Sequence, residues 1–191
     1  MTATPRHSPR LHRAILALVA GGLCGLLTVP TAPAAGPPKP AGKPRLARLP
    51  KTAPSPGNNP TTAAKVKLGK QLFFDPRLSG NNKTSCASCH FPTRAFTDRR
   101  TRSPGQQGRP LSRNTPTVVN SGFLKLLFWD GRATSLEQQA LMPIESPVEM
   151  NQDLDALETE LDNIPGYARQ FRKVFETGVT RSGIARSLAA F

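Results

Sequence analysis

Apolar side chains recur at helical spacing in five segments of the chain, all after residue 60. Where apolar residues lie three or four positions apart they share one face, which predicts an amphipathic helix. The predicted helices span residues 63–74, 135–142, 153–161, 165–175 and 182–191. The second should begin at Ser135, whose hydroxyl can cap the first turn while Gln138 reaches back. It should stop before Pro143, which lacks a backbone donor.

The long segment between the first two predicted helices has no regular period. No part of the chain keeps the alternation of apolar and polar residues that predicts a strand. Residues 91–112, which are rich in Pro, Gly, Gln and Arg, are predicted to form an ordered loop. The predicted fold class is therefore all-α, with amphipathic helices around one core and with long loops.

The first 60 residues differ in composition from the rest. Residues 1–35 combine a basic start, an apolar stretch of about sixteen residues and a small-residue cleavage site, an order typical of a secretory signal peptide. The apolar stretch is shorter than the roughly twenty residues of a membrane-spanning helix. Residues 36–60 are Pro-rich and basic without acids, which predicts a disordered linker. The folded domain is expected at residues 61–191, in the periplasm.

Charge and cysteine content limit the classes of protein. The chain has 26 Lys and Arg against 12 Asp and Glu, a net charge of +14, but much of the excess precedes residue 61. The remaining basic residues are scattered, without interleaved aromatic residues on which bases could stack, so nucleic-acid binding is not expected. The residual positive charge would suit an acidic redox partner. Three cysteines are too few for a disulfide scaffold.

Cysteine and histidine occur together at one place. Once the predicted signal peptide is removed, the soft ligands left are Cys86, Cys89 and His90, in the sequence Cys-Ala-Ser-Cys-His. This pattern is typical of covalent haem c, in which the two thiols join the porphyrin and the adjacent histidine binds the iron. A structural zinc site would need four ligands, and a thioredoxin-like dithiol would need a βαβ unit, so haem attachment is favoured.

Further motifs flank the haem motif in a fixed order. They are LGKQLFFDPRLS at residues 68–79, RNTPT at 113–117, FWDGR at 128–132 and PVEM at 147–150. With them, residues 65–191 resemble the N-terminal, peroxidatic half of the bacterial dihaem cytochrome c peroxidase and MauG family. The resemblance implies a cytochrome c-like domain with one covalently bound haem c, and a second haem in a further domain beyond Phe191. The last predicted helix ends on its apolar face without a stop signal, which agrees with a continuing chain.

The resemblance also implies roles for individual residues. His90 matches the proximal iron ligand, and Glu149 matches the glutamate that moves a proton between the two oxygens of peroxide. Trp129 matches a residue between the two haems that carries electrons, and a packed core position at a turn is a second interpretation that is compatible with this role. Asn114 matches a ligand of an interdomain calcium ion. Gln106 stands where many members carry an iron-capping histidine, so an open distal face is expected.

The predicted function is a periplasmic c-type haem peroxidase that reduces hydrogen peroxide with electrons from a small c-type cytochrome or cupredoxin. MauG-like oxidation of a protein substrate is a variant within the same class, and a homodimer is the assembly to test. The alternative is a non-enzymatic monohaem cytochrome c electron carrier. In a carrier, Met142 or Met150 would bind the iron as the sixth ligand and close it to peroxide.

Overall fold

The computed structural model describes residues 47–191, and this part of the chain contains helices but no β-strand. The α-helices are α1 (Ala63–Phe73), α2 (Leu136–Glu145), α3 (Leu154–Asp162), α4 (Pro165–Phe175) and α5 (Arg181–Ala190). The predicted all-α class is confirmed. Within the described residues, no helix combines the length and hydropathy needed to cross a bilayer. The predicted signal peptide and the start of the predicted linker lie outside them.

N-cap side chains explain where most helices begin. A side chain accepts a first-turn backbone N–H at Thr62, Ser135, Asp153 and Thr180. Ser135 therefore caps α2 as predicted. Gln138 also reaches back, but its Oε1 accepts from the backbone N–H of Thr134 at 3.0 Å. Each cap satisfies a donor that would otherwise have no partner within the helix.

Helix α2 differs from its prediction at the C-terminal end. It continues through Pro143 to Glu145, so the expected stop before Pro143 is wrong. Pro143 lies in the last turn, where its fixed φ suits a helix and where only one intrahelical hydrogen bond is lost. The backbone N–H of Ser146 donates to the Met142 carbonyl at 3.0 Å and closes that turn.

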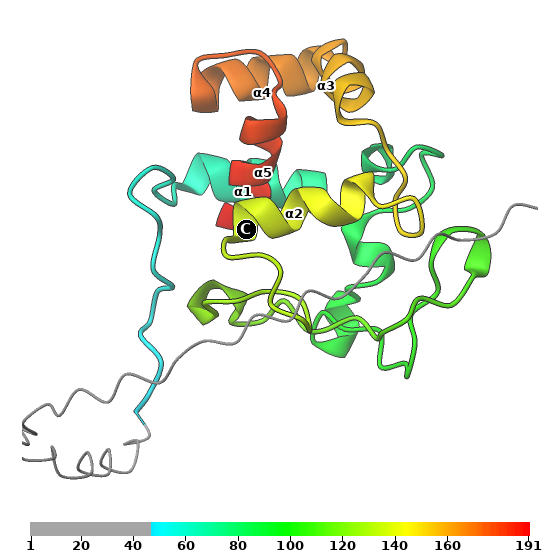
Figure 1. Ribbon diagram of the computed structural model, residues 1–191. Coiled ribbons are helices and arrows are strands. Elements are labelled where there is room, and N and C mark those ends of the chain that lie inside the picture. The colour runs from blue at the N-terminus through cyan, green and yellow to red at the C-terminus, as the bar shows by residue number, and fades with distance from the viewer. Residues whose placement is uncertain (1–46) are drawn as a thin grey trace, which may run out of the picture. The chain divides into compact units, whose positions relative to one another are not determined.

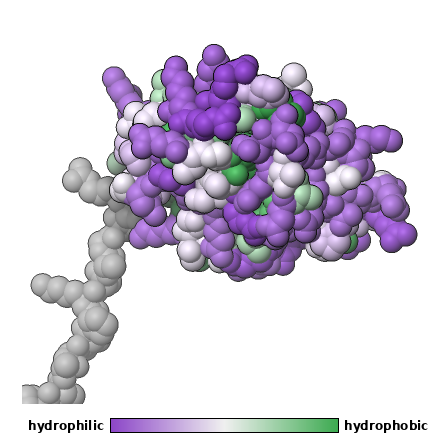
Figure 2. Space-filling view, turned by 90° about the horizontal axis from the view of Figure 1, so that it is seen from above, coloured by the Kyte–Doolittle hydropathy of each residue, from purple (hydrophilic) through white to green (hydrophobic). Residues whose placement is uncertain are grey.

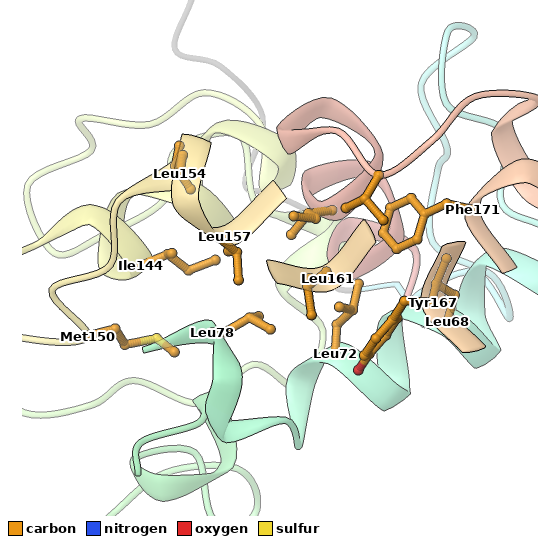
Figure 3. Close-up of a cluster of buried hydrophobic side chains, with 12 residues drawn as sticks. Leu68, Leu72, Leu78, Ile144, Met150, Leu154, Leu157, Leu161, Tyr167 and Phe171 are labelled. Carbon is orange, nitrogen blue, oxygen red and sulfur yellow. The ribbon is translucent and has the colours of Figure 1, made fainter. Parts of the chain in front are cut away.

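The helices meet around one cluster of buried apolar side chains (Figure 3). In Figure 1, α3 and α4 lie together at the top of the view, with α1, α2 and α5 below them. Helices α1 and α5 cross closely at Gly69, where a Cβ atom would lie 1.9 Å from the Ser187 carbonyl oxygen. The outer surface seen in Figure 2 is mainly hydrophilic, with small hydrophobic areas between.

A buried hydrogen-bonded pair joins α4 to the end of α1. The Tyr167 hydroxyl donates to Asp75 Oδ2 at 2.5 Å, and Arg77 Nε donates to Asp75 Oδ1 at 2.9 Å. Burial raises the pKa of Asp75, but the hydrogen bonds from Arg77 and Tyr167 outweigh burial and leave the pKa below its usual value. Burial and the contact with Asp75 raise the pKa of Tyr167.

The folded structure begins before residue 61, within the predicted linker. Asn59 is buried, and its Nδ2 donates to Glu137 Oε1 at 2.7 Å. Its Oδ1 accepts from Lys65 Nζ at 2.9 Å. Composition alone missed this contact because a single buried amide does not change the polar, Pro-rich character of the segment.

Candidate haem site

One short turn carries the three residues of the haem motif. A 3₁₀ helix begins at Cys86 and ends at Ser88, and the N–H groups of Cys89 and His90 both donate to the Cys86 carbonyl, at 3.2 and 2.9 Å. Ser85 and Ser88 close the turn with reciprocal side-chain hydrogen bonds. Local hydrogen bonds therefore hold both thiols and the imidazole in one fixed arrangement.

Both thiols are free and half-buried. Burial raises the pKa of Cys86 to about 12, and burial also raises the pKa of Cys89. Reactive dithiols instead have lowered pKa values, because the thiolate is the attacking species. The raised pKa values therefore argue against a thioredoxin-like function for the pair.

The imidazole of His90 is oriented by a backbone carbonyl. Its Nδ1 lies 3.0 Å from the Phe96 oxygen, which can only accept, so Nδ1 carries the proton and Nε2 keeps its lone pair. Burial also lowers the pKa of His90, which favours the neutral form that binds iron. Ala95 and Phe96 have φ angles of 53° and 57°, a left-handed turn that directs this carbonyl. No motif or spacing in the sequence predicted this turn or the hydrogen bond that it directs to His90.

Two distant segments meet on the side of Glu149. The backbone N–H of Gln106 donates to the Val148 carbonyl at 2.9 Å, and Gln106 Nε2 donates to the Met150 carbonyl at 3.1 Å. Gly105 permits this approach, because a Cβ atom there would lie 2.3 Å from the Val148 oxygen. The structure therefore brings the predicted residues Gln106 and Glu149 onto adjacent segments.

Negative charges near the haem motif come from Glu149 and Asp98, and Arg100 acts on Cys89 in the opposite direction. Both carboxylates act on Cys89 and His90, in each case in the direction that raises the pKa. Asp98 is 1% exposed, and its Oδ1 accepts from the backbone N–H of Arg100 at 3.1 Å. Among the described residues Asp98 Oδ2 has no hydrogen-bond partner. Sequence reasoning missed Asp98, although it is the one acid among the many basic residues of this segment.

Trp129 and Asn114 lie together at the surface. The indole of Trp129 is 60% exposed, and its Nε1 donates to the Asn114 backbone carbonyl at 3.2 Å. Within residues 47–191 the indole is therefore not packed in the core. Arg113 and Asp130 form an ion pair at 3.2 Å that joins the same two motifs. In residues 47–191 no group of three or more His, Cys, Asp or Glu is arranged to hold a metal ion, so calcium at Asn114 stays a prediction.

Met150 does not suit the role of an iron ligand. It is 4% exposed and belongs to the apolar cluster shared by the helices (Figure 3). A thioether packed in that core would have to leave it to reach the iron. The structure therefore disfavours the carrier that would use Met150.

The residues present fit haem c. They provide two thiols and an imidazole on one turn, with Nδ1 of the imidazole on the Phe96 carbonyl and a lowered pKa that favours its neutral form, and the carboxylate of Glu149 acts on that imidazole. Together with the all-α fold, they define a c-type haem domain.

Comparison with known proteins gives the family. The family model described as di-haem cytochrome c peroxidase matches residues 63–191, so the chain belongs to this family. The chain is 46% identical over 146 residues to the methylamine utilization protein MauG of Methylorubrum extorquens, which covers 75% of this chain and 41% of that protein. It is 41% identical over 133 residues to the cytochrome c551 peroxidase of Nitrosomonas europaea, covering 69% and 40%.

Solved structures agree with this assignment. A crystal structure of a MauG-like protein associated with microbial copper homeostasis matches with a TM-score of 0.69 and 35% identity, over 75% of this chain and 44% of that one. The diheme peroxidase BthA from Burkholderia thailandensis matches with a TM-score of 0.60 and 28% identity, over 69% and 38%. The chain thus spans about two fifths of the length of its curated relatives.

Proposed function

We propose that this chain forms the peroxide-reacting haem domain of a periplasmic dihaem oxidoreductase of the cytochrome c peroxidase or MauG type. The observation that carries the proposal is the pairing of a His90 with a free Nε2 and a half-buried Glu149 on a segment fixed by Gln106. Family membership supports haem c as the cofactor.

Each site residue has a distinct role in this proposal. Cys86 and Cys89 hold the porphyrin, and His90 binds its iron. Bound haem supplies the redox chemistry, in which hydrogen peroxide, two electrons and two protons give two molecules of water. Glu149 takes a proton from one peroxide oxygen and returns it to the other, which becomes the leaving group.

Gln106 has a structural role near the distal side. Its side-chain amide donates to the Met150 carbonyl, which holds the segment that carries Glu149. An amide engaged in this way is not available to close the iron as a histidine would. The proposal therefore expects a haem that reacts with peroxide without prior reduction.

Trp129 and Asn114 face the remainder of the enzyme in this proposal. An exposed indole supports electron transfer between Trp129 and a second haem, which belongs to a further domain. Calcium at Asn114 and a homodimeric assembly are parts of the same proposal. The electrons come from a small c-type cytochrome or cupredoxin, or, in the MauG-like case, from a protein substrate that is oxidised.

The test compares two glutamates in the full-length protein with covalently bound haem. Glu149→Gln should lower the rate of reaction with peroxide about 10²-fold or more, because the proton relay is lost. Glu145→Gln, at an exposed position at the end of α2, is the matched control and should keep the rate. Stopped-flow spectroscopy measures both. Equal rates in the two variants would contradict the role of Glu149, and a six-coordinate iron with a methionine ligand would favour the electron carrier.

A further inference from the structure

Residues 75–80 form a tight turn between α1 and the haem motif, and we call them the 75–80 turn. Asp75 caps the short 3₁₀ helix of this turn by accepting from the backbone N–H of Arg77 at 2.9 Å, and it also accepts from Arg77 Nε at 2.9 Å. The Ser79 side chain is fully buried, and its hydroxyl donates to the Pro76 carbonyl at 2.8 Å. Its own side chains therefore fix the backbone of the turn.

The last residue of the 75–80 turn contacts the segment that carries Glu149. We call this segment, residues 146–152, the glutamate segment. The backbone N–H of Gly80 donates to the Met150 carbonyl at 3.0 Å. A Cβ atom on Gly80 would lie 2.1 Å from the Asn151 carbonyl oxygen, so any larger residue must displace the glutamate segment or the turn.

A side-chain hydrogen bond and apolar packing support the same contact. Gln152 Nε2 donates to the Arg77 carbonyl at 3.2 Å, so both ends of the 75–80 turn hold the glutamate segment. Leu78 from the turn and Met150 from the segment are both buried in the apolar cluster of the helices (Figure 3). The contact is therefore part of the folded core on one side of Glu149.

Hydrogen bonds within the glutamate segment make it compact. The N–H groups of Glu149 and Asn151 both donate to the Ser146 carbonyl, at 3.0 and 2.9 Å, and the N–H of Met150 donates to the Pro143 carbonyl at 3.2 Å. Asn151 has a positive φ of 47°, which turns the chain back on itself. Because these bonds tie neighbouring residues together, a displacement at Met150 or Asn151 would move Glu149 as well.

The 75–80 turn links the glutamate segment to the iron ligand. It leads along the chain into the haem motif, whose first cysteine follows Gly80 by six residues. We infer that Gly80 and Gln152 are positioning residues, which set the place of Glu149 relative to His90; this inference rests on the proposed function. A carboxylate moves a proton only from within hydrogen-bond reach, and a misplacement of about 1 Å can slow a reaction by about 10²-fold.

The first test is a double-mutant cycle in the full-length protein with covalently bound haem, followed by stopped-flow spectroscopy with hydrogen peroxide. Gly80→Ala should slow the reaction about tenfold, because the added Cβ atom displaces the glutamate segment. In a protein that already carries Glu149→Gln, the same change should slow it less than about twofold, because a positioning residue acts only through the carboxylate. Gly166→Ala in α4, where a Cβ atom would meet no atom within 4 Å, is the matched control and should keep the wild-type rate.

Gln152 gives a second, milder variant. Gln152→Met keeps the length of the side chain and removes its donor, so it should slow the reaction about threefold. Gln170→Met is the matched control, because Gln170 is also half-buried and also donates to a carbonyl, that of Gly166, at 3.2 Å. This control should keep the wild-type rate.

Hydrogen–deuterium exchange provides a measurement that does not depend on catalysis. The backbone amides of residues 146–152 should exchange at least about twofold faster in Gly80→Ala and Gln152→Met than in wild type, and at the wild-type rate in both controls. Unchanged exchange in both variants would overturn the inference, and so would an equal loss of rate from Gly80→Ala with and without Glu149. If Glu149→Gln alone leaves the rate unchanged, the proposed function fails, while the exchange data still report whether the 75–80 turn holds the glutamate segment.

Discussion

The helices and the loop region between α1 and α2 are held by different interactions. In the helices, the buried side chains are almost all apolar and form one cluster. In the loop region, residues 76–135, buried polar side chains are as prominent as apolar ones: Ser79, Asp98, Ser103 and Thr115 against Leu78, Leu127 and Ala133. The haem motif lies in the second region. Apolar burial therefore stabilises the domain, while directional hydrogen bonds arrange its chemistry.

The largest effect should come from the apolar cluster. Phe171→Ala removes a side chain that is fully buried, so it should lower the free energy of unfolding by about 3–5 kcal/mol. Leu126→Ala in the loop region, where the side chain is 59% exposed, should change it by less than about 0.5 kcal/mol. Urea denaturation followed by circular dichroism measures both. Similar losses of unfolding free energy in the two variants would contradict the view that the apolar cluster of the helices, and not the loop region, stabilises the domain.

Changing a glycine to alanine tests, in each region, a place where two backbone segments pack closely. Gly69→Ala must push α1 away from α5 and should destabilise the fold by about 1–3 kcal/mol. Gly105→Ala should destabilise less, because the loop it displaces packs few apolar side chains. It should instead slow the reaction with peroxide, since it separates Gln106 from the segment that carries Glu149. A Gly105→Ala protein with an unchanged peroxide rate would show that this contact does not position Glu149.

This difference explains what the sequence could predict. The helix positions followed from the spacing of apolar residues, because that spacing reports which face is buried. The error at Pro143 arose because a proline in the last turn removes only one hydrogen bond. Cys86, Cys89 and His90 could be identified because their chemistry depends on adjacent positions in the sequence.

Other features of the site depend on contacts between distant segments. The Phe96 carbonyl reaches His90 through two successive residues with positive φ, neither of them glycine. No local pattern indicates such a turn. Asp98 and Asn59 were missed for a related reason, since a single polar residue in a polar segment carries no sign of its burial.

The pair of Tyr167 and Asp75 lies where α1 meets the loop region, and it should make stability depend on pH. Asp75 has a lowered pKa, so its contribution is present above the unfolded value of about 3.9 and is lost as the pH falls through the lower folded pKa. Tyr167 has a raised pKa, so its contribution is present below about pH 10 and is lost as the pH rises above it.

Tyr167→Phe tests this pair. It removes the shorter of the two hydrogen bonds that Asp75 Oδ2 accepts, leaving the one from Arg77 Nε at 3.2 Å, and should lower the free energy of unfolding at pH 7 by about 1–3 kcal/mol. Because Tyr167 is the one tyrosine of the chain, the variant should also lose most of the decline in stability above pH 10. Denaturation at pH 7 and at pH 10.5 measures both effects. If the free energy of unfolding of the variant fell above pH 10 as much as that of wild type, the decline would come from groups other than Tyr167.

The smallest effect on stability is expected at Asp98. Asp98→Asn keeps the shape of the side chain, and Oδ2 has no partner among the described residues to lose, so the free energy of unfolding should change by about 1 kcal/mol or less. The change removes a buried carboxylate that acts on His90, and a negative charge there would stabilise the ferric over the ferrous state of a bound haem. The midpoint potential of the haem should therefore rise in a redox titration. Glu176→Gln, an exposed change near the end of α4, is the control and should leave the potential unaltered. An unchanged potential in Asp98→Asn would show that this carboxylate does not act electrostatically on the haem.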